Sequence, residues 1–160
     1  MALLDLWRDE QRAMSALGHS LTEDQGALVV PACPAWTVKD VYAHMAGVAD
    51  DLLAGRLDGV ATDPWTQAQV DARRDDPLAV VLDEWDEKAP ALIEALTPLG
   101  DAVDSRLVVD LWTHHQDVRG AVDLPGDRDS ERSVWAADGL RSFARSQFRR
   151  AGLDPADLAF

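Results

Sequence analysis

The fold is decided by the stretch TVKDVYAHMAGVADDLL, residues 37–53. Thr37 is a favourable N-cap, and Asp40 stands three positions later, a spacing typical of a capping box at the start of a helix. The apolar residues that follow recur every three or four positions, which favours an amphipathic helix over residues 38–53. This stripe consists of Val38, Val41, Tyr42, Met45, Val48, Ala49 and Leu52.

The same helical period recurs in the rest of the chain, and no segment alternates as a half-buried strand does. Pro90 interrupts one of these patterns and predicts a kink or a break there. Residues 1–160 are therefore expected to form a single all-α domain, an antiparallel helix bundle. The further helices are expected over residues 3–17, 66–74, 78–96, 105–122 and 130–150, with one short turn near residues 22–25.

The composition limits the partners of this protein. Its net charge is -14, which repels phosphate backbones and argues against nucleic acid as a partner. No apolar run is long enough to span a membrane, and the N-terminus lacks a basic region followed by an apolar one, so a cytoplasmic protein is expected. The basic pair Arg73-Arg74 is interpreted as solvated.

Cysteine chemistry is limited to one residue, since Cys33 is the only cysteine. An internal disulfide and a cysteine-rich zinc site are thereby excluded. Nothing basic in its neighbourhood obviously lowers the pKa of its thiol, so Cys33 is interpreted as buried and inert. Any bound metal would have to be held by histidine and carboxylate groups.

A second stretch, DLWTHHQD at residues 110–117, carries the candidate chemistry. Asp110 and His114 are four positions apart, so a helix presents a carboxylate and an imidazole side by side. His44, on the helix over residues 38–53, could supply a third ligand from across the bundle. Two imidazoles and one carboxylate make a divalent-metal site with positions left open for a thiol, water or substrate.

The helical phase distinguishes His114 from its neighbour His115. His114 has Asp110 one turn before it and Asp117 one turn after it, whereas His115 lies nearer the centre of the apolar stripe. His114 is therefore the expected ligand, and His115 is interpreted as a satisfied core or edge histidine. The alternative is that His44 and His114 only line the seam between two helices.

Two stretches resemble the metal-binding domain of the mycothiol-dependent maleylpyruvate isomerase family, within the DinB-like superfamily. They are PACPAWTVKDVYAHMAG at residues 31–47 and DLWTHHQDVR at residues 110–119. The resemblance implies a DinB-like antiparallel four-helix bundle that binds a divalent metal, most often Zn²⁺, through His44, Asp110 and His114. The acidic ligand of that family is more usually glutamate, one methylene longer than Asp110.

The resemblance also implies mycothiol as cosubstrate, so we expect a metal- and mycothiol-dependent thiol transferase or isomerase acting on a small electrophilic substrate. Asp117 and His115 are candidate catalytic residues that could orient His114 or move a proton, and Tyr42 is a weaker candidate. The alternatives are a non-catalytic helical-bundle binding module and a metal-dependent hydrolase. A homodimer is also left open.

Overall fold

The computed structural model describes residues 2–154, and these residues are helical apart from their connections. The one extended pairing among them is an isolated bridge between Val29 and Thr37, so the all-α prediction is confirmed. No helix in this part of the chain is both long and apolar enough to cross a bilayer. The elements are α1 (Leu3–His19), α2 (Glu23–Gly26), α3 (Val38–Ala54), α4 (Asp63–Asp71), α5 (Leu78–Leu96), the 3-10 helix η1 (Thr97–Ala102), α6 (Arg106–Ala121) and α7 (Glu131–Arg150).

The chain divides into two compact units, one ending at Pro125 and the other beginning at Gly126. The first unit contains α1 to α6 and η1. In the second unit, the Ser130 side chain caps α7 by accepting a hydrogen bond from the backbone N–H of Ser133 at 3.2 Å. The single-domain organisation of residues 1–160 stays a prediction.

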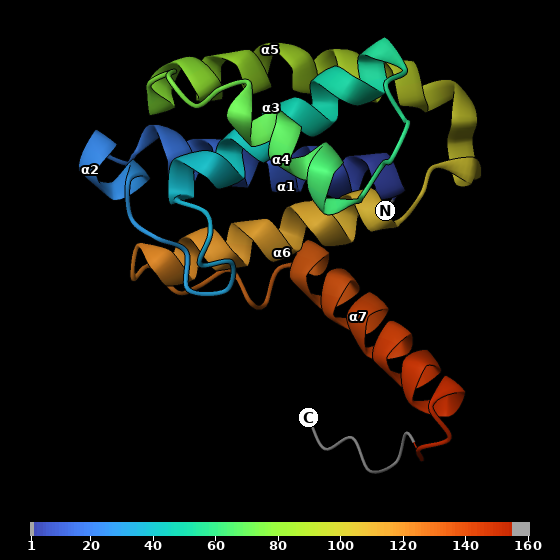
Figure 1. Ribbon diagram of the computed structural model, residues 1–160. Helices are drawn as coiled ribbons and strands as arrows, with labels where there is room; N and C mark the ends of the chain where they lie inside the picture. Colours follow the sequence, from blue (N-terminus) through green and yellow to red (C-terminus); the bar gives the residue numbers. More distant parts are fainter. Residues whose placement is uncertain (1, 155–160) are drawn as a thin grey trace. The chain divides into compact units, whose positions relative to one another are not determined.

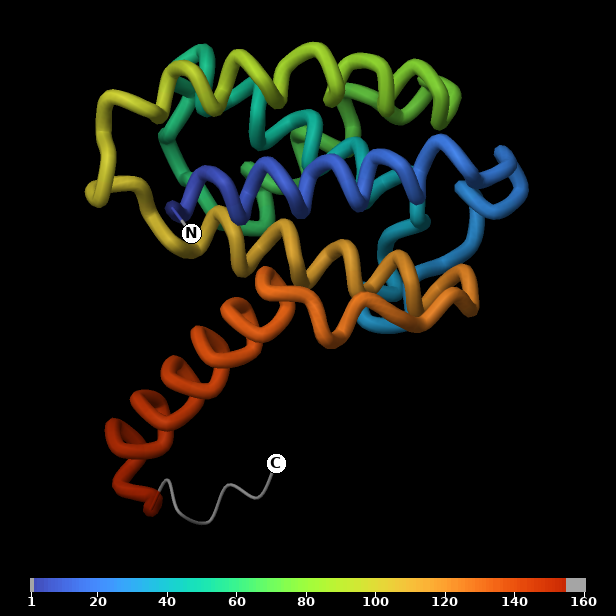
Figure 2. The backbone as a smooth tube through the Cα atoms, turned by 180° about the vertical axis from the view of Figure 1, so that it is seen from behind, coloured from blue at the N-terminus to red at the C-terminus, as the bar shows by residue number. Residues whose placement is uncertain are grey.

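Helices α1, α3, α5 and α6 form a four-helix bundle (Figures 1 and 2). Both α1 and α3 pack against α5 and against α6, so α1 and α3 occupy opposite corners. The expected antiparallel pairing holds for α1 with α5 and for α3 with α6. Two neighbouring pairs, α3 with α5 and α1 with α6, instead run in the same direction (Figures 1 and 2). For α3 and α5 the reason is that the connection through α4 returns the chain to the end where α3 began.

Helix α3 begins and ends as its sequence dictates. The Thr37 Oγ1 accepts from the Asp40 backbone N–H at 3.2 Å, and the Asp40 carboxylate accepts from the Thr37 N–H at 2.8 Å. This capping box is the one predicted, and it satisfies two amides that the first turn leaves unpaired. Gly55 ends the helix with φ 69°, a left-handed conformation that glycine adopts without strain.

The sequence predicts a kink or a break at Pro90. Helix α5 runs through Pro90 without a break. The proline is exposed. A proline ring removes one helical hydrogen bond. The continuity of α5 therefore depends on its buried face, which Leu78, Val81, Leu82, Trp85, Ala89, Leu92 and Ile93 make.

The bundle core is built around Tyr42 of α3 and Trp85 of α5, whose ring centroids are 6.0 Å apart. The Tyr42 hydroxyl donates to the Met14 carbonyl oxygen at 2.9 Å, and burial raises the pKa of Tyr42 well above its ordinary value. Gly18 permits this packing, since a Cβ there would lie 2.6 Å from Leu82 Cδ2. Tyr42 thus links helices in the core.

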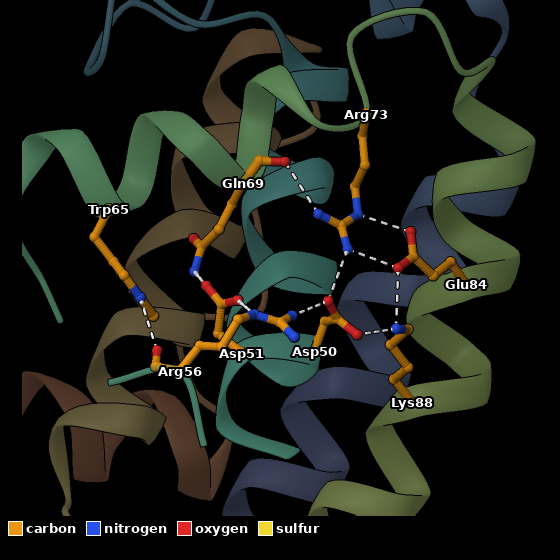
Figure 3. A network of polar contacts seen from close by, with 8 residues as sticks. All are labelled: Asp50, Asp51, Arg56, Trp65, Gln69, Arg73, Glu84 and Lys88. Carbon is orange, nitrogen blue, oxygen red and sulfur yellow. Dashed lines mark hydrogen bonds and ion pairs between the residues drawn. The ribbon is translucent and has the colours of Figure 1, made fainter. Parts of the chain in front are cut away.

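Helix α4 is held to the bundle by Arg73, which corrects the interpretation of Arg73-Arg74 as a solvated pair. Arg74 is exposed, but Arg73 is buried and donates to both carboxylate oxygens of Glu84 on α5, at 2.7 and 2.6 Å (Figure 3). The guanidinium can be buried because the bidentate carboxylate compensates its charge.

Glu84→Gln is expected to lower the free energy of unfolding at pH 7 by about 2 kcal/mol. Breaking a fully buried ion pair costs about 3–5 kcal/mol, and Glu84 remains 26% exposed. Hydrogen bonds from Arg73 lower the pKa of Glu84 below its ordinary 4.5. The stabilisation is therefore complete above pH 4.5 and is lost as the pH falls through the lowered pKa.

Urea unfolding of the wild type and Glu84→Gln between pH 7 and pH ~3 checks this expectation. The difference between the two proteins should shrink as the pH falls. Asp71→Asn removes the exposed partner of Arg74 and serves as the control, with a nearly unchanged free energy of unfolding at every pH. A difference between wild type and Glu84→Gln that is independent of pH would contradict the assignment.

Candidate metal centre

The three predicted ligands meet at the seam between α3 and α6. The Nε2 atom of His44 lies 3.7 Å from one Asp110 oxygen, and the Nε2 atom of His114 lies 3.7 Å from the other. One donor atom from each residue lies within 4.8 Å of the other two. The one-turn spacing of Asp110 and His114 on α6 and the antiparallel packing of α3 against α6 create this convergence.

The separations fit a shared divalent cation. At 3.7 Å the nitrogen and oxygen atoms are too far apart for hydrogen bonds. Ligands bound tetrahedrally to one cation at about 2.1 Å lie about 3.4 Å from one another. Two imidazole nitrogens and a carboxylate oxygen are donors that zinc and related divalent metals accept. These residues therefore have both the chemistry and the spacing of a metal site.

The protonation states also suit metal binding. Burial lowers the pKa of His114, and this effect exceeds the opposing influence of Asp110, so the imidazole is neutral at neutral pH. Burial by itself would raise the pKa of Asp110. The nearby imidazoles of His44 and His114 outweigh this effect, so the pKa of Asp110 is lowered and the group is a carboxylate.

One side of the candidate site is covered and another is open. The Trp36 ring lies 5.3 Å from the His44 ring and 6.0 Å from the His114 ring, measured between centroids. The side chains of His44 and His114 are 6% and 16% exposed, whereas that of Asp110 is 48% exposed. A small molecule would therefore reach the donor atoms from the Asp110 side.

Two further side chains lie near the second ring nitrogens of the histidines, and only the one at His44 is within hydrogen-bond distance. The Nδ1 atom of His44 lies 2.7 Å from the Gln69 Oε1 atom, and that of His114 lies 3.7 Å from an Asp117 oxygen. Burial raises the pKa of Asp117. The helical spacing of Asp117 and His114 predicts that these two residues are neighbours. The sequence does not predict the contact of Gln69, since no local pattern relates residue 69 to residue 44.

His115 has partners away from this group. Its Nδ1 atom lies 2.5 Å from a Glu10 oxygen on α1, and its Nε2 atom accepts from the Arg119 guanidinium at 3.0 Å. Both His115 and Glu10 are buried. This environment matches the interpretation of His115 as a satisfied core histidine. Of the two residues predicted to assist His114, the structure brings Asp117 to it and pairs His115 with Glu10.

Cys33 is half-buried, not fully buried as its sequence context suggested. Burial raises the pKa of its thiol, and the negative charge of Asp117 raises it further. The group therefore stays a thiol at neutral pH, which agrees with the prediction that it is inert.

A four-helix bundle with a His-Asp-His group between two of its helices defines the class of this protein. The chain belongs to the mycothiol maleylpyruvate isomerase N-terminal domain family, whose model matches residues 7–119. That match covers all three candidate ligands and confirms both the family resemblance and the DinB-like fold. No curated protein and no solved structure matches the chain.

Proposed function

We propose that this protein binds a divalent cation, with Zn²⁺ as the first candidate, through His44, Asp110 and His114, and uses it with mycothiol as cosubstrate. The reaction would transfer the thiol to a small electrophilic substrate or isomerise that substrate. The observation that carries the proposal is the convergence of the three donor groups: each histidine Nε2 lies 3.7 Å from an Asp110 oxygen, and one donor atom of each residue lies within 4.8 Å of the other two. Membership of a family named for a mycothiol-dependent isomerase supports the choice of thiol.

The chain's own residues have separate tasks in this proposal. A bound divalent cation would supply one property, the stabilisation of a thiolate at neutral pH. His44, Asp110 and His114 would hold the cation, and the Asp117 carboxylate lies 3.7 Å from the second ring nitrogen of His114. Trp36 limits water on one side, while the exposed edge of Asp110 leaves room for the thiol. A cytoplasmic location, where small thiols are kept reduced, goes with this function.

A metal-dependent hydrolase is the second candidate function, because the Asp117 carboxyl group lies next to the candidate metal site. A carboxyl group with a raised pKa, close to a metal site, can serve as a general base toward water. A non-catalytic binding module would have the same ligands and no reaction. The three functions differ in whether a thiol, water or neither is activated.

Cobalt substitution tests the proposed function, because a thiolate bound to Co²⁺ gives an intense charge-transfer absorption. A Cys33→Ala background removes the protein's own thiol. Adding 2-mercaptoethanol to this Co²⁺-loaded variant is expected to produce the charge-transfer band, and mycothiol should produce it at lower concentration. A cobalt spectrum unaffected by either thiol would contradict the thiol-dependent function and favour the hydrolase or the binding module.

A further inference from the structure

We propose that Gln69 on α4 is a positioning residue that holds His44 with its Nδ1 protonated and its Nε2 free for the cation. This inference rests on the proposed metal site and assigns α4 a role in it. His44 and Gln69 are both buried, and their Nδ1 and Oε1 atoms are 2.7 Å apart. A metal-binding histidine is oriented by the hydrogen bond that its second nitrogen makes.

A carboxylate fixes the direction of every hydrogen bond in this chain of contacts. The Gln69 Nε2 atom donates to Asp51 at 2.7 Å, and an ionised carboxylate can only accept. The amide oxygen of Gln69 must then face His44, where it can only accept as well. His44 therefore has to donate from Nδ1. This leaves the lone pair on Nε2, the atom that faces Asp110.

Two arginines, Arg56 and Arg73, contact the Asp51–Gln69 pair (Figure 3). Arg56 donates from its Nε to the second Asp51 oxygen at 2.7 Å, so both oxygens of this carboxylate accept hydrogen bonds. Arg73 donates from Nη1 to the Gln69 backbone oxygen at 3.1 Å while it is paired with Glu84. The side chain and the backbone of Gln69 are thus both fixed by charged groups.

Gly47 provides an independent indication that the position of Gln69 matters. A Cβ at Gly47 would lie 2.4 Å from Gln69 Cβ and 2.6 Å from its Cγ, closer than real contacts allow. A glycine inside a helix ordinarily costs about 0.5–1 kcal/mol relative to alanine. At this site the missing side chain is what lets Gln69 approach α3 and reach His44.

The imidazole tautomer of His44 tests the inference directly in metal-free protein. Nitrogen-15 chemical shifts should show the Nδ1–H form in the wild type and a larger Nε2–H population in Gln69→Met, which keeps the volume and removes the acceptor. Gln67→Met is the matched control on the same helix, since the Gln67 amide contacts Trp36 and Asp71. An Nε2–H tautomer in the wild type, or an unchanged tautomer in Gln69→Met, would overturn the inference.

Zinc affinity gives the second measurement. Gln69→Met and Gly47→Ala should each bind zinc about 10–100-fold more weakly than the wild type, with the far-ultraviolet circular dichroism retained. Gln67→Met should bind as the wild type does. Equal zinc affinity in all four proteins would also overturn the inference. A wild type that binds no zinc would contradict the metal site itself, and the tautomer measurement would then decide the role of Gln69 alone.

Discussion

Zinc should raise the melting temperature of the wild type by roughly 10 °C and leave that of His44→Ala unchanged. A ligand at about 1,000 times its Kd adds about 4 kcal/mol to the stability of the folded state. For a chain of this size about 1 kcal/mol corresponds to roughly 2–4 °C. His44→Ala removes one of the two imidazole donors. The remaining ligands, Asp110 and His114, cannot hold the cation at the same zinc concentration. Thermal unfolding with and without zinc measures the difference.

The matched control is His19→Ala. His19 is a histidine at the end of α1 that pairs with Asp86, outside the candidate site. This variant should show the full zinc shift. Helix content should persist in His44→Ala, because the core of the bundle is built by other residues. Equal shifts in His44→Ala and His19→Ala, or no shift in the wild type, would contradict the site.

The second large effect is expected at Trp85. Trp85→Ala should lower the free energy of unfolding by about 4 kcal/mol, since it leaves a cavity at a fully buried position of α5. Neighbouring helices contact this ring, with Tyr42 at 6.0 Å between centroids. Denaturant unfolding followed by circular dichroism gives the value.

Trp85→Phe is the control, and it should cost much less than Trp85→Ala. The indole N–H of Trp85 is buried and makes no hydrogen bond within residues 2–154. Removing that unpaired donor offsets part of the free energy that is lost with the smaller side chain. If phenylalanine cost as much as alanine at this position, the indole N–H would have to make a stabilising contact, contrary to the packing described.

The helices could be predicted because their signals are local. The Thr37–Asp40 capping box and the apolar period of α3 lie within one segment, and the structure begins this helix where they place it. The directions of the neighbouring helices could not be read in this way. The path through α4 makes α3 and α5 parallel, and the contact between Arg73 and Glu84 forms only after the chain has turned back.

The candidate metal site likewise has a part that the sequence predicts and a part that it does not. Asp110 and His114 are one helical turn apart, so their proximity follows from sequence spacing. The pairing of His44 with them came from the family resemblance, since no spacing rule connects two separate helices. The contact of Gln69 with His44 could not be predicted from the sequence, because it depends on the close packing of α4 against Gly47 of α3.

X-ray absorption at the zinc edge of the purified protein tests the metal site most directly. The expected result is about one zinc per chain with nitrogen and oxygen neighbours at about 2.0–2.2 Å, and an imidazole contribution that His44→Ala removes. Adding a thiol to the Cys33→Ala variant should introduce one sulfur at about 2.3 Å. Protein that retains no zinc at stoichiometric supply, or an absorption spectrum unaltered by His44→Ala, would contradict the site.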